Sequence, residues 1–192
     1  AEKLLMNRKR IIHKCQDKIR VFREILQDIG EEKLKYTFVY APQGNYESSE
    51  SEEEFESVGF IQKLLDETKK LYPNKRCNTF IGTDSKDKRA TLLKAFGQGT
   101  IDVLFAMKCL DEGVDVPRAE CGIFTSSTGN PREFIQRRGR LLRNHAEKTF
   151  SYIYDMVVIP STVNREECNS SMERNQVKAE LKRVAYFASL AV

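Results

Sequence analysis

Residues 130–143 read NPREFIQRRGRLLR, and this stretch predicts a helix with two different faces. Asn130 and Pro131 are residue types that favour the start of a helix, with Asn as N-cap and Pro in the first turn. At about 100° per residue, the apolar side chains of the segment fall on one side: Phe134, Ile135, Leu141 and Leu142. The opposite side carries the remaining residues of interest: Gln136, Gly139, Arg140 and Arg143.

The polar face of this predicted helix carries two candidate phosphate ligands. Arg140 and Arg143 are about one turn apart, and a pair of guanidinium groups at that spacing suits phosphate oxygens. Gly139 beside them costs roughly 1 kcal/mol of helix stability relative to Ala, which favours a face that a ligand approaches closely. An ordinary surface helix with exposed arginines is the alternative that this segment alone leaves open.

Short apolar runs and helical patterns alternate along the rest of the chain. We predict strands at residues 36–40, 77–81, 101–106, 121–125 and 150–158, with helical patterns between them at 58–71 and 86–97. Several of the runs are mostly apolar instead of alternating, which is typical of strands that are buried on both faces. The alternation therefore predicts an α/β fold, a parallel sheet flanked by helices on both faces.

Two further helices are predicted outside this alternation. One is a long amphipathic helix at residues 3–29, ended by Gly30. The other has apolar residues on one side, at Val177, Leu181, Val184 and Ala188. We therefore divide the chain into an N-terminal linking helix (1–33), the α/β domain (34–160) and a C-terminal loop and helix (161–192). The Glu- and Ser-rich segment 47–56 is predicted to be a solvated, mobile loop, with an electrostatic gate that repels nucleic acid as the alternative.

Composition is that of an ordinary soluble protein of one sizeable domain: 192 residues, 40% hydrophobic, with a net charge of +4. The mild positive charge permits nucleic-acid binding but does not argue for it. No apolar run approaches the ~20 residues that span a bilayer, so we expect no membrane partner.

The five cysteines are widely spaced and odd in number, which favours core thiols in a reducing cytoplasm over disulfides or zinc. His13 and His145 lie in no ligand-like cluster, so we expect no metal site. Ala1 in place of Met favours an excised or processed chain.

Three segments with candidate ligand residues follow predicted strands. In parallel sheets, ligands bind beyond the carboxyl ends of the strands. Gln43 and Thr83 lie in the first two segments, for which routine turn chemistry is the alternative. In the third segment, Gly113 lets backbone approach a ligand, and Asp115 can accept hydrogen bonds from a sugar hydroxyl or hold an arginine.

Two of these stretches, in this order, resemble motifs of a known family. LFAMKCLDEGVDVP (104–117) followed by FIQRRGRLLR (134–143) is similar to the fifth and sixth motifs of superfamily 2 helicases and translocases. YTFVYAPQG (36–44) and FIGTDSKDKRATLLKAF (80–96) look like the weaker segments that precede them. The resemblance implies that residues 34–158 form the second, C-terminal RecA-like lobe. Gln136 and Met107 stand where DEAD-box proteins carry His and Thr. The motif sequences are closer to those of restriction-enzyme and excision-repair translocases.

The resemblance also implies roles for individual residues. Arg140 and Arg143 would be arginine fingers for the γ-phosphate of ATP, and Gln136 would couple nucleotide to nucleic acid. Gly113 and Asp115 would contact the nucleotide and its ribose or position a finger. The implied contacts to the nucleic-acid backbone, in DNA, are Gln43, Thr83 and Lys86.

The cofactor is expected to lie mainly on a partner. The sequence contains no G-x-x-x-x-G-K-[ST] loop and no acidic metal box. ATP with Mg²⁺ would therefore be held mainly by the N-terminal RecA-like lobe of the same protein, and this chain alone is expected to be inactive. A nucleic-acid-binding or scaffolding domain that works without ATP is the alternative function. A receiver-type phosphate-binding domain fits less well, because it requires an acidic cluster at the first strand ends.

Overall fold

The computed structural model describes residues 17–41, 50–107, 118–125, 135, 138, 139, 141, 143, 145–158 and 171–189. The chain splits into two compact units, Ala1–Met156 and Val157–Val192. The first unit contains the whole sheet, and the second contains helix α6 (Ser171–Ala188).

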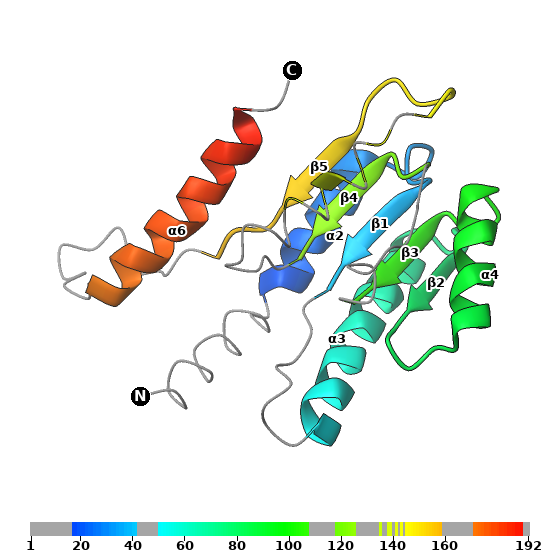
Figure 1. Ribbon diagram of the computed structural model, residues 1–192, viewed down its shortest axis with the longest axis horizontal. Helices are drawn as coiled ribbons and strands as arrows, with labels where there is room; N and C mark the ends of the chain where they lie inside the picture. The colour runs from blue at the N-terminus through cyan, green and yellow to red at the C-terminus, as the bar shows by residue number, and fades with distance from the viewer. Residues whose placement is uncertain are drawn as a thin grey trace. The chain divides into compact units, whose positions relative to one another are not determined.

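The sheet of the first unit has five strands, all parallel (Figure 1). They are β1 (Thr37–Tyr40), β2 (Cys77–Phe80), β3 (Val103–Ala106), β4 (Cys121–Phe124) and β5 (Tyr152–Asp155). Their spatial order is β2-β3-β1-β4-β5, so the first strand of the chain lies at the centre. The central strands β1, β3 and β4 are buried along their whole length, as their apolar runs predict.

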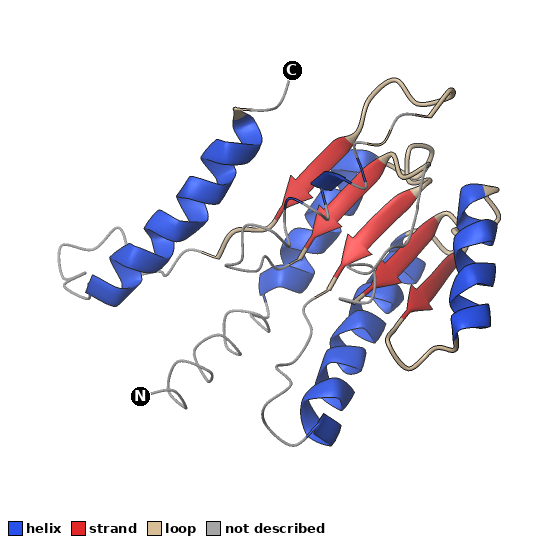
Figure 2. Ribbon diagram, viewed as in Figure 1, coloured by secondary structure: helices blue, strands red, loops and turns tan. Residues whose placement is uncertain are grey.

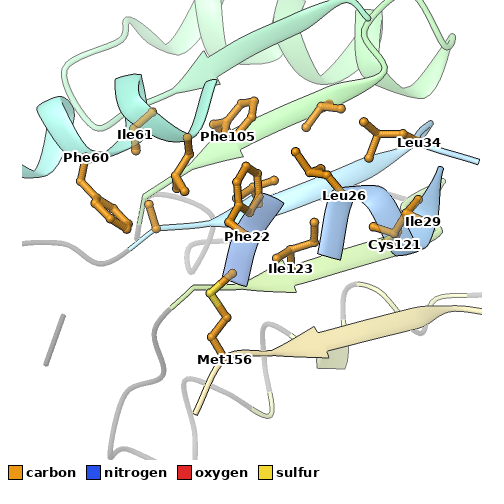
Figure 3. Close-up of a cluster of buried hydrophobic side chains, with 14 of the residues drawn as sticks. Phe22, Leu26, Ile29, Leu34, Phe60, Ile61, Phe105, Cys121, Ile123 and Met156 are labelled. Carbon is orange, nitrogen blue, oxygen red and sulfur yellow. The ribbon is translucent and has the colours of Figure 1, made fainter. Parts of the chain in front are cut away.

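Helices α2 (Asp17–Ile29) and α3 (Glu50–Leu71) cover one face of the sheet (Figure 2). Their apolar side chains pack against alternate residues of the central strands, as Figure 3 shows for Phe22 and Leu26 of α2 with Phe105 and Ile123. Full burial of one such side chain is worth roughly 1.5–3 kcal/mol. An ion pair between Arg23 and Glu67 also joins the two helices.

Helix α4 (Lys86–Gly97) packs on the opposite face with the other set of alternate strand residues. Aromatic rings fill this layer. Phe38 lies 4.6 Å from Phe96 of α4, and Tyr40 stacks on Phe124 at 4.7 Å between ring centroids. Both faces of the sheet are therefore covered, and the predicted fold class is confirmed.

The prediction of a mobile loop at residues 47–56 is wrong for residues 50–56, because α3 begins at Glu50. Glutamate has a good helix propensity, and acidic residues are stabilising near a helix N-terminus, where the helix dipole is positive. A high density of acidic residues is therefore compatible with a helix start as well as with a loop. Strand β5 is also shorter than its predicted range of 150–158, because it pairs with four residues of β4.

Both terminal helices are present in the described part of the chain. Within the predicted range 3–29, the structure describes α2, whose Phe22 and Leu26 are fully buried in the sheet core. In α6, Leu181 is 52% exposed and Val184 is 37% exposed. The division of the chain at residues 33 and 160 stays a prediction. Among the helices that the structure describes, none is both long and apolar enough to cross a membrane.

Candidate nucleotide and nucleic-acid interface

The sheet aligns the carboxyl ends of the three strands that precede candidate ligand residues. Ala106 at the end of β3 pairs with Tyr40 of β1 on one side and with Phe80 of β2 on the other. The three strands therefore end at one edge of the sheet, where ligand sites form in parallel α/β folds. The turn after β2 lies among the described residues, whereas residues 42–49 and 108–117, after β1 and β3, lie outside them.

A buried carboxylate organises the turn after β2. Asp84 is 8% exposed, accepts a hydrogen bond from the backbone N–H of Ile81 at 3.0 Å, and forms an ion pair with Lys88. The hydroxyl of Ser85 caps α4 by accepting a hydrogen bond from the N–H of Lys88 at 3.2 Å. These contacts fix the turn from both sides, so Thr83 is held on a defined backbone.

The candidate residues of this turn are accessible. Thr83 and Lys86 are both exposed, and Lys86 is the first residue of α4. The positive end of a helix dipole together with a Lys ammonium suits a phosphate group. Lys88 already forms an ion pair with Asp84, so of these two lysines Lys86 stays the predicted phosphate contact.

The arginine-bearing segment packs on the same face of the sheet as α4. Ile135, Arg138, Gly139 and Leu141 are helical, which supports the helix predicted for residues 131–143. The side chain of Leu141 is fully buried in the aromatic layer, beside Gly122 of β4. A Cβ atom at Gly122 would lie 2.2 Å from Cδ1 of Leu141, so the absence of a side chain there provides the space for the leucine.

The expected burial of Ile135 with Leu141 is not observed, because Ile135 is 39% exposed. Six residues at 100° each place the two side chains roughly 120° apart around a helix. Since Leu141 points straight at the sheet, Ile135 falls at the edge of the contact. Gly139 and Arg143 lie roughly 160–200° from Leu141 on the same count, and both are exposed as predicted.

The end of the arginine segment is held near the amino-terminal end of β4. The carbonyl oxygen of Leu141 accepts hydrogen bonds from Nζ of Lys148 at 2.5 Å and from Oγ of Ser151 at 2.7 Å. Lys148 Nζ also donates to the carbonyl of Ala119, just before β4, at 3.1 Å. Thr83 lies beyond the opposite, carboxyl end of its strand, so the Leu141 carbonyl and the turn after β2 lie at opposite edges of the sheet.

The turn that follows the arginine segment also contacts, through Arg118, the residue just before β1. Arg118 forms an ion pair with Glu147, and its guanidinium carbon lies 4.1 Å from the centre of the Tyr36 ring. Desolvation by burial lowers the pKa of Lys148, and the negative charge of Glu120 opposes that shift. Lys148 therefore loses hydration in this turn and gains two carbonyl acceptors.

Five candidate residues lie outside the described residues: Gln43, Gly113, Asp115, Gln136 and Arg140. Their roles stay predictions. Within the residues that the structure does place, no group of three or more His, Cys, Asp or Glu side chains is arranged to hold a metal ion.

Sequence reasoning missed the residues that fix the arginine segment: Gly122, Lys148 and Ser151. Two of them had a usable signal. An isolated Gly within a strand often marks a close approach by another chain segment. A Lys shortly after a helix end often binds the last carbonyl groups of that helix.

Comparison with known proteins places this architecture in a family. The family model for the helicase conserved C-terminal domain matches residues 17–145. The DNA 3'-5' translocase XPB2 of Sulfurisphaera tokodaii is 45% identical over 58 residues, which are 30% of this chain and 13% of that protein. The putative ATP-dependent helicase IRC3 of Saccharomyces cerevisiae is 30% identical over 90 residues, which are 46% of this chain and 13% of that protein.

Solved structures agree on the fold. The C-terminal part of the Fun30 ATPase domain superposes with a TM-score of 0.59 at 14% identity, covering 85% of this chain and 44% of that chain. The C-terminal domain of the DEAD-box protein Dbp5 superposes with a TM-score of 0.57 at 16% identity, covering 88% of this chain and 78% of that chain.

The strand order, the covering helices and these superpositions define a RecA-like domain. Since the family model covers most of its residues, the chain belongs to the helicase conserved C-terminal domain family. The resemblance noted in the sequence is thereby confirmed. The matched segments span only 13% of the length of the two relatives named above.

Proposed function

We propose that this chain is the C-terminal motor lobe of an ATP-dependent DNA helicase or translocase. One observation carries the proposal: a segment rich in arginine is fixed to the sheet through Leu141 while Arg143, two residues later, is exposed. An exposed arginine close to a firmly packed stretch of backbone is what an arginine finger requires.

In this proposal the nucleotide lies between the chain and an N-terminal RecA-like lobe of the same protein. Mg²⁺ and most of the phosphate contacts belong to that lobe. Arg140 and Arg143 would stabilise the charge that develops on the transferring phosphoryl group, an effect worth roughly 10³–10⁵ in rate in other NTPases. Gln136 would link the nucleotide to the nucleic acid, and Gly113 and Asp115 would contact the nucleotide and its ribose.

The proposed nucleic-acid contacts lie at the carboxyl edge of the sheet. Thr83 and Lys86 are exposed there, at the same edge of the sheet as the ends of β1 and β3, which supports a role as phosphate-backbone contacts. Gln43 would extend this track beyond β1. Contacts to phosphate alone hold a strand without reading its sequence, as a translocating motor requires. We propose DNA as the substrate because one relative is named as a DNA translocase.

The test uses the protein that carries this chain together with its N-terminal lobe. Arg143→Ala and Arg140→Ala should each lower the rate of DNA-stimulated ATP hydrolysis by about 10³-fold or more, with DNA binding largely retained. Arg20→Ala is the matched control, because Arg20 is an exposed arginine of α2 that pairs with Glu24.

Unchanged ATP hydrolysis in both finger variants would contradict the proposal and favour the ATP-independent scaffold. Comparing stimulation by DNA with stimulation by RNA checks the substrate. The restriction or repair branch, the cytoplasmic location and the inactivity of the isolated chain stay predictions.

A further inference from the structure

We propose that Lys148 and Ser151 are positioning residues for the arginine fingers, because they hold the arginine-bearing helix by the carbonyl group of Leu141. This inference rests on the proposed function. It extends that function to two side chains in the turn before β5, which would contact neither ATP nor nucleic acid.

The carbonyl of Leu141 is held by two donors at once. Lys148 Nζ lies 2.5 Å from the oxygen and Ser151 Oγ lies 2.7 Å from it, so both lone pairs of the oxygen are used. The last carbonyl groups of a helix have no partner within the helix, and a cation there also interacts favourably with the helix dipole. The two side chains therefore complete the end of this helix.

Lys148 connects that helix end to the sheet. Its ammonium group donates a second hydrogen bond, of 3.1 Å, to the carbonyl of Ala119 at the start of β4. One partly buried ammonium thus bridges the helix that carries the arginines and the strand against which it packs. A cation with fixed acceptors in a partly desolvated place gives a stiffer connection than an exposed lysine would.

We call the hydrogen bonds from Lys148 and Ser151 to the Leu141 carbonyl the clamp. The clamp lies directly beside the proposed fingers in the sequence. Leu141 follows Arg140 in the chain and precedes Arg143 by two residues. Its side chain fills the hollow at Gly122, and its carbonyl is fixed by Lys148 and Ser151, so side chain and backbone are held independently. A displacement of about 1 Å at a reacting group can cost roughly 10²-fold in rate. Loosening this residue should therefore reduce catalysis before it reduces binding.

The turn itself does not depend on the clamp alone. The backbone N–H of Lys148 donates to the carbonyl of His145 at 3.0 Å, and Glu147 pairs with Arg118. Strand β5 begins with a hydrogen bond of 2.8 Å from the N–H of Tyr152 to the carbonyl of Glu120. These contacts remain when the Lys148 ammonium is removed, so the fold should tolerate that change.

The experiment measures steady-state DNA-stimulated ATP hydrolysis in the protein that contains both lobes. Lys148→Met keeps most of the aliphatic stem and removes the donors. It should lower kcat roughly 10–100-fold, with KM for ATP and the Kd for DNA changed by less than about twofold. Ser151→Ala should give a smaller loss. Lys148→Arg and Ser151→Thr retain a donor and should restore most of kcat.

Lys69→Met is the matched control. Lys69 Nζ donates to the carbonyl of Lys75 at 2.5 Å, which is a similar lysine bond beyond the end of α3, remote from the arginine segment. Its kcat should equal that of the wild type. The thermal midpoint of each variant separates loss of positioning from loss of folding, and Ser151→Ala serves where Lys148→Met does not fold.

The outcomes separate the two proposals. Full ATP hydrolysis in both Arg140→Ala and Arg143→Ala overturns the proposed function. Loss of hydrolysis in Arg143→Ala alongside a wild-type kcat in both Lys148→Met and Ser151→Ala overturns the positioning role alone. A loss in Lys148→Met that Lys148→Arg does not restore also overturns it, as does a loss that only follows the thermal midpoint. Adding Lys148→Met to Arg143→Ala should lower kcat little further, because both act through one group.

Discussion

Substituting Gly122 by Ala should destabilise the sheet domain through a single contact. A Cβ at this position would lie 2.2 Å from Cδ1 of Leu141 and 3.2 Å from its Cδ2 and Cγ. The strand backbone on one side and the clamped helix on the other leave the leucine little freedom to move. Inserting a methyl group into a packed core costs typically about 1–3 kcal/mol, and we expect Gly122→Ala to fall in that range.

A double-mutant cycle isolates this contact. Leu141→Ala alone should lower the free energy of unfolding by about 2–5 kcal/mol, because it leaves a cavity under the helix. In the double variant, the new methyl group at position 122 enters space that the leucine has vacated. The double variant should therefore be more stable than the sum of the single effects, with a coupling of about 0.5–3 kcal/mol. Urea denaturation of the chain, followed by circular dichroism, measures all four free energies.

The control is Gly59→Ala. Gly59 is an exposed residue of α3, and nothing beyond its own stretch of helix lies within 4 Å of the point that a Cβ would occupy. Alanine there should stabilise the helix by roughly 0.5–1 kcal/mol. A Gly122→Ala variant as stable as the wild type would refute the packing argument. So would single effects that add without coupling.

Two further predictions concern ionisable groups. Burial alone would raise the pKa of Asp102, but hydrogen bonds from Arg76 outweigh it and lower that pKa below its ordinary value of 3.8. The Asp102–Arg76 pair therefore stabilises the folded chain above about pH 4, and this stabilisation is lost as the pH falls through the lowered pKa. Asp102→Asn should lower the free energy of unfolding by about 1–3 kcal/mol at neutral pH. The deficit should shrink in acid denaturation below about pH 4, and a constant deficit would contradict the assignment. Burial also raises the pKa of the Cys121 thiol to about 12, so iodoacetamide at mildly alkaline pH should label Cys121 only in the unfolded chain, as peptide mass spectrometry would show.

The fold can be predicted from the sequence because its main determinants are local patterns. The mostly apolar runs at 36–40, 101–106 and 121–125 predict strands, and each contains a strand of four residues. Periodicity predicts the helix at 86–97, and the structure has it, with Ser85 as its N-cap. A mostly apolar run of this length is typical of a strand that is buried on both faces, so the local pattern is enough to predict these strands.

Other features depend on contacts between distant residues, which a local pattern does not contain. The exposure of Ile135 follows from the direction in which Leu141 points, and that direction is set by the hollow at Gly122. The clamp likewise requires Lys148 to reach a carbonyl seven positions earlier. The helix start at Glu50 is predictable only if acidic residues are weighed as helix-start signals as well as loop signals.

The central place of β1 has a consequence for synthesis on the ribosome. Its four residues are buried, yet both neighbouring strands, β3 and β4, are translated after it. Until they emerge, the nascent chain carries an apolar strand with two open edges, which is a surface prone to self-association. A product that stops short of Cys121 keeps one of those edges permanently, so premature termination in this region should yield aggregates or substrates for chaperones instead of a smaller folded domain.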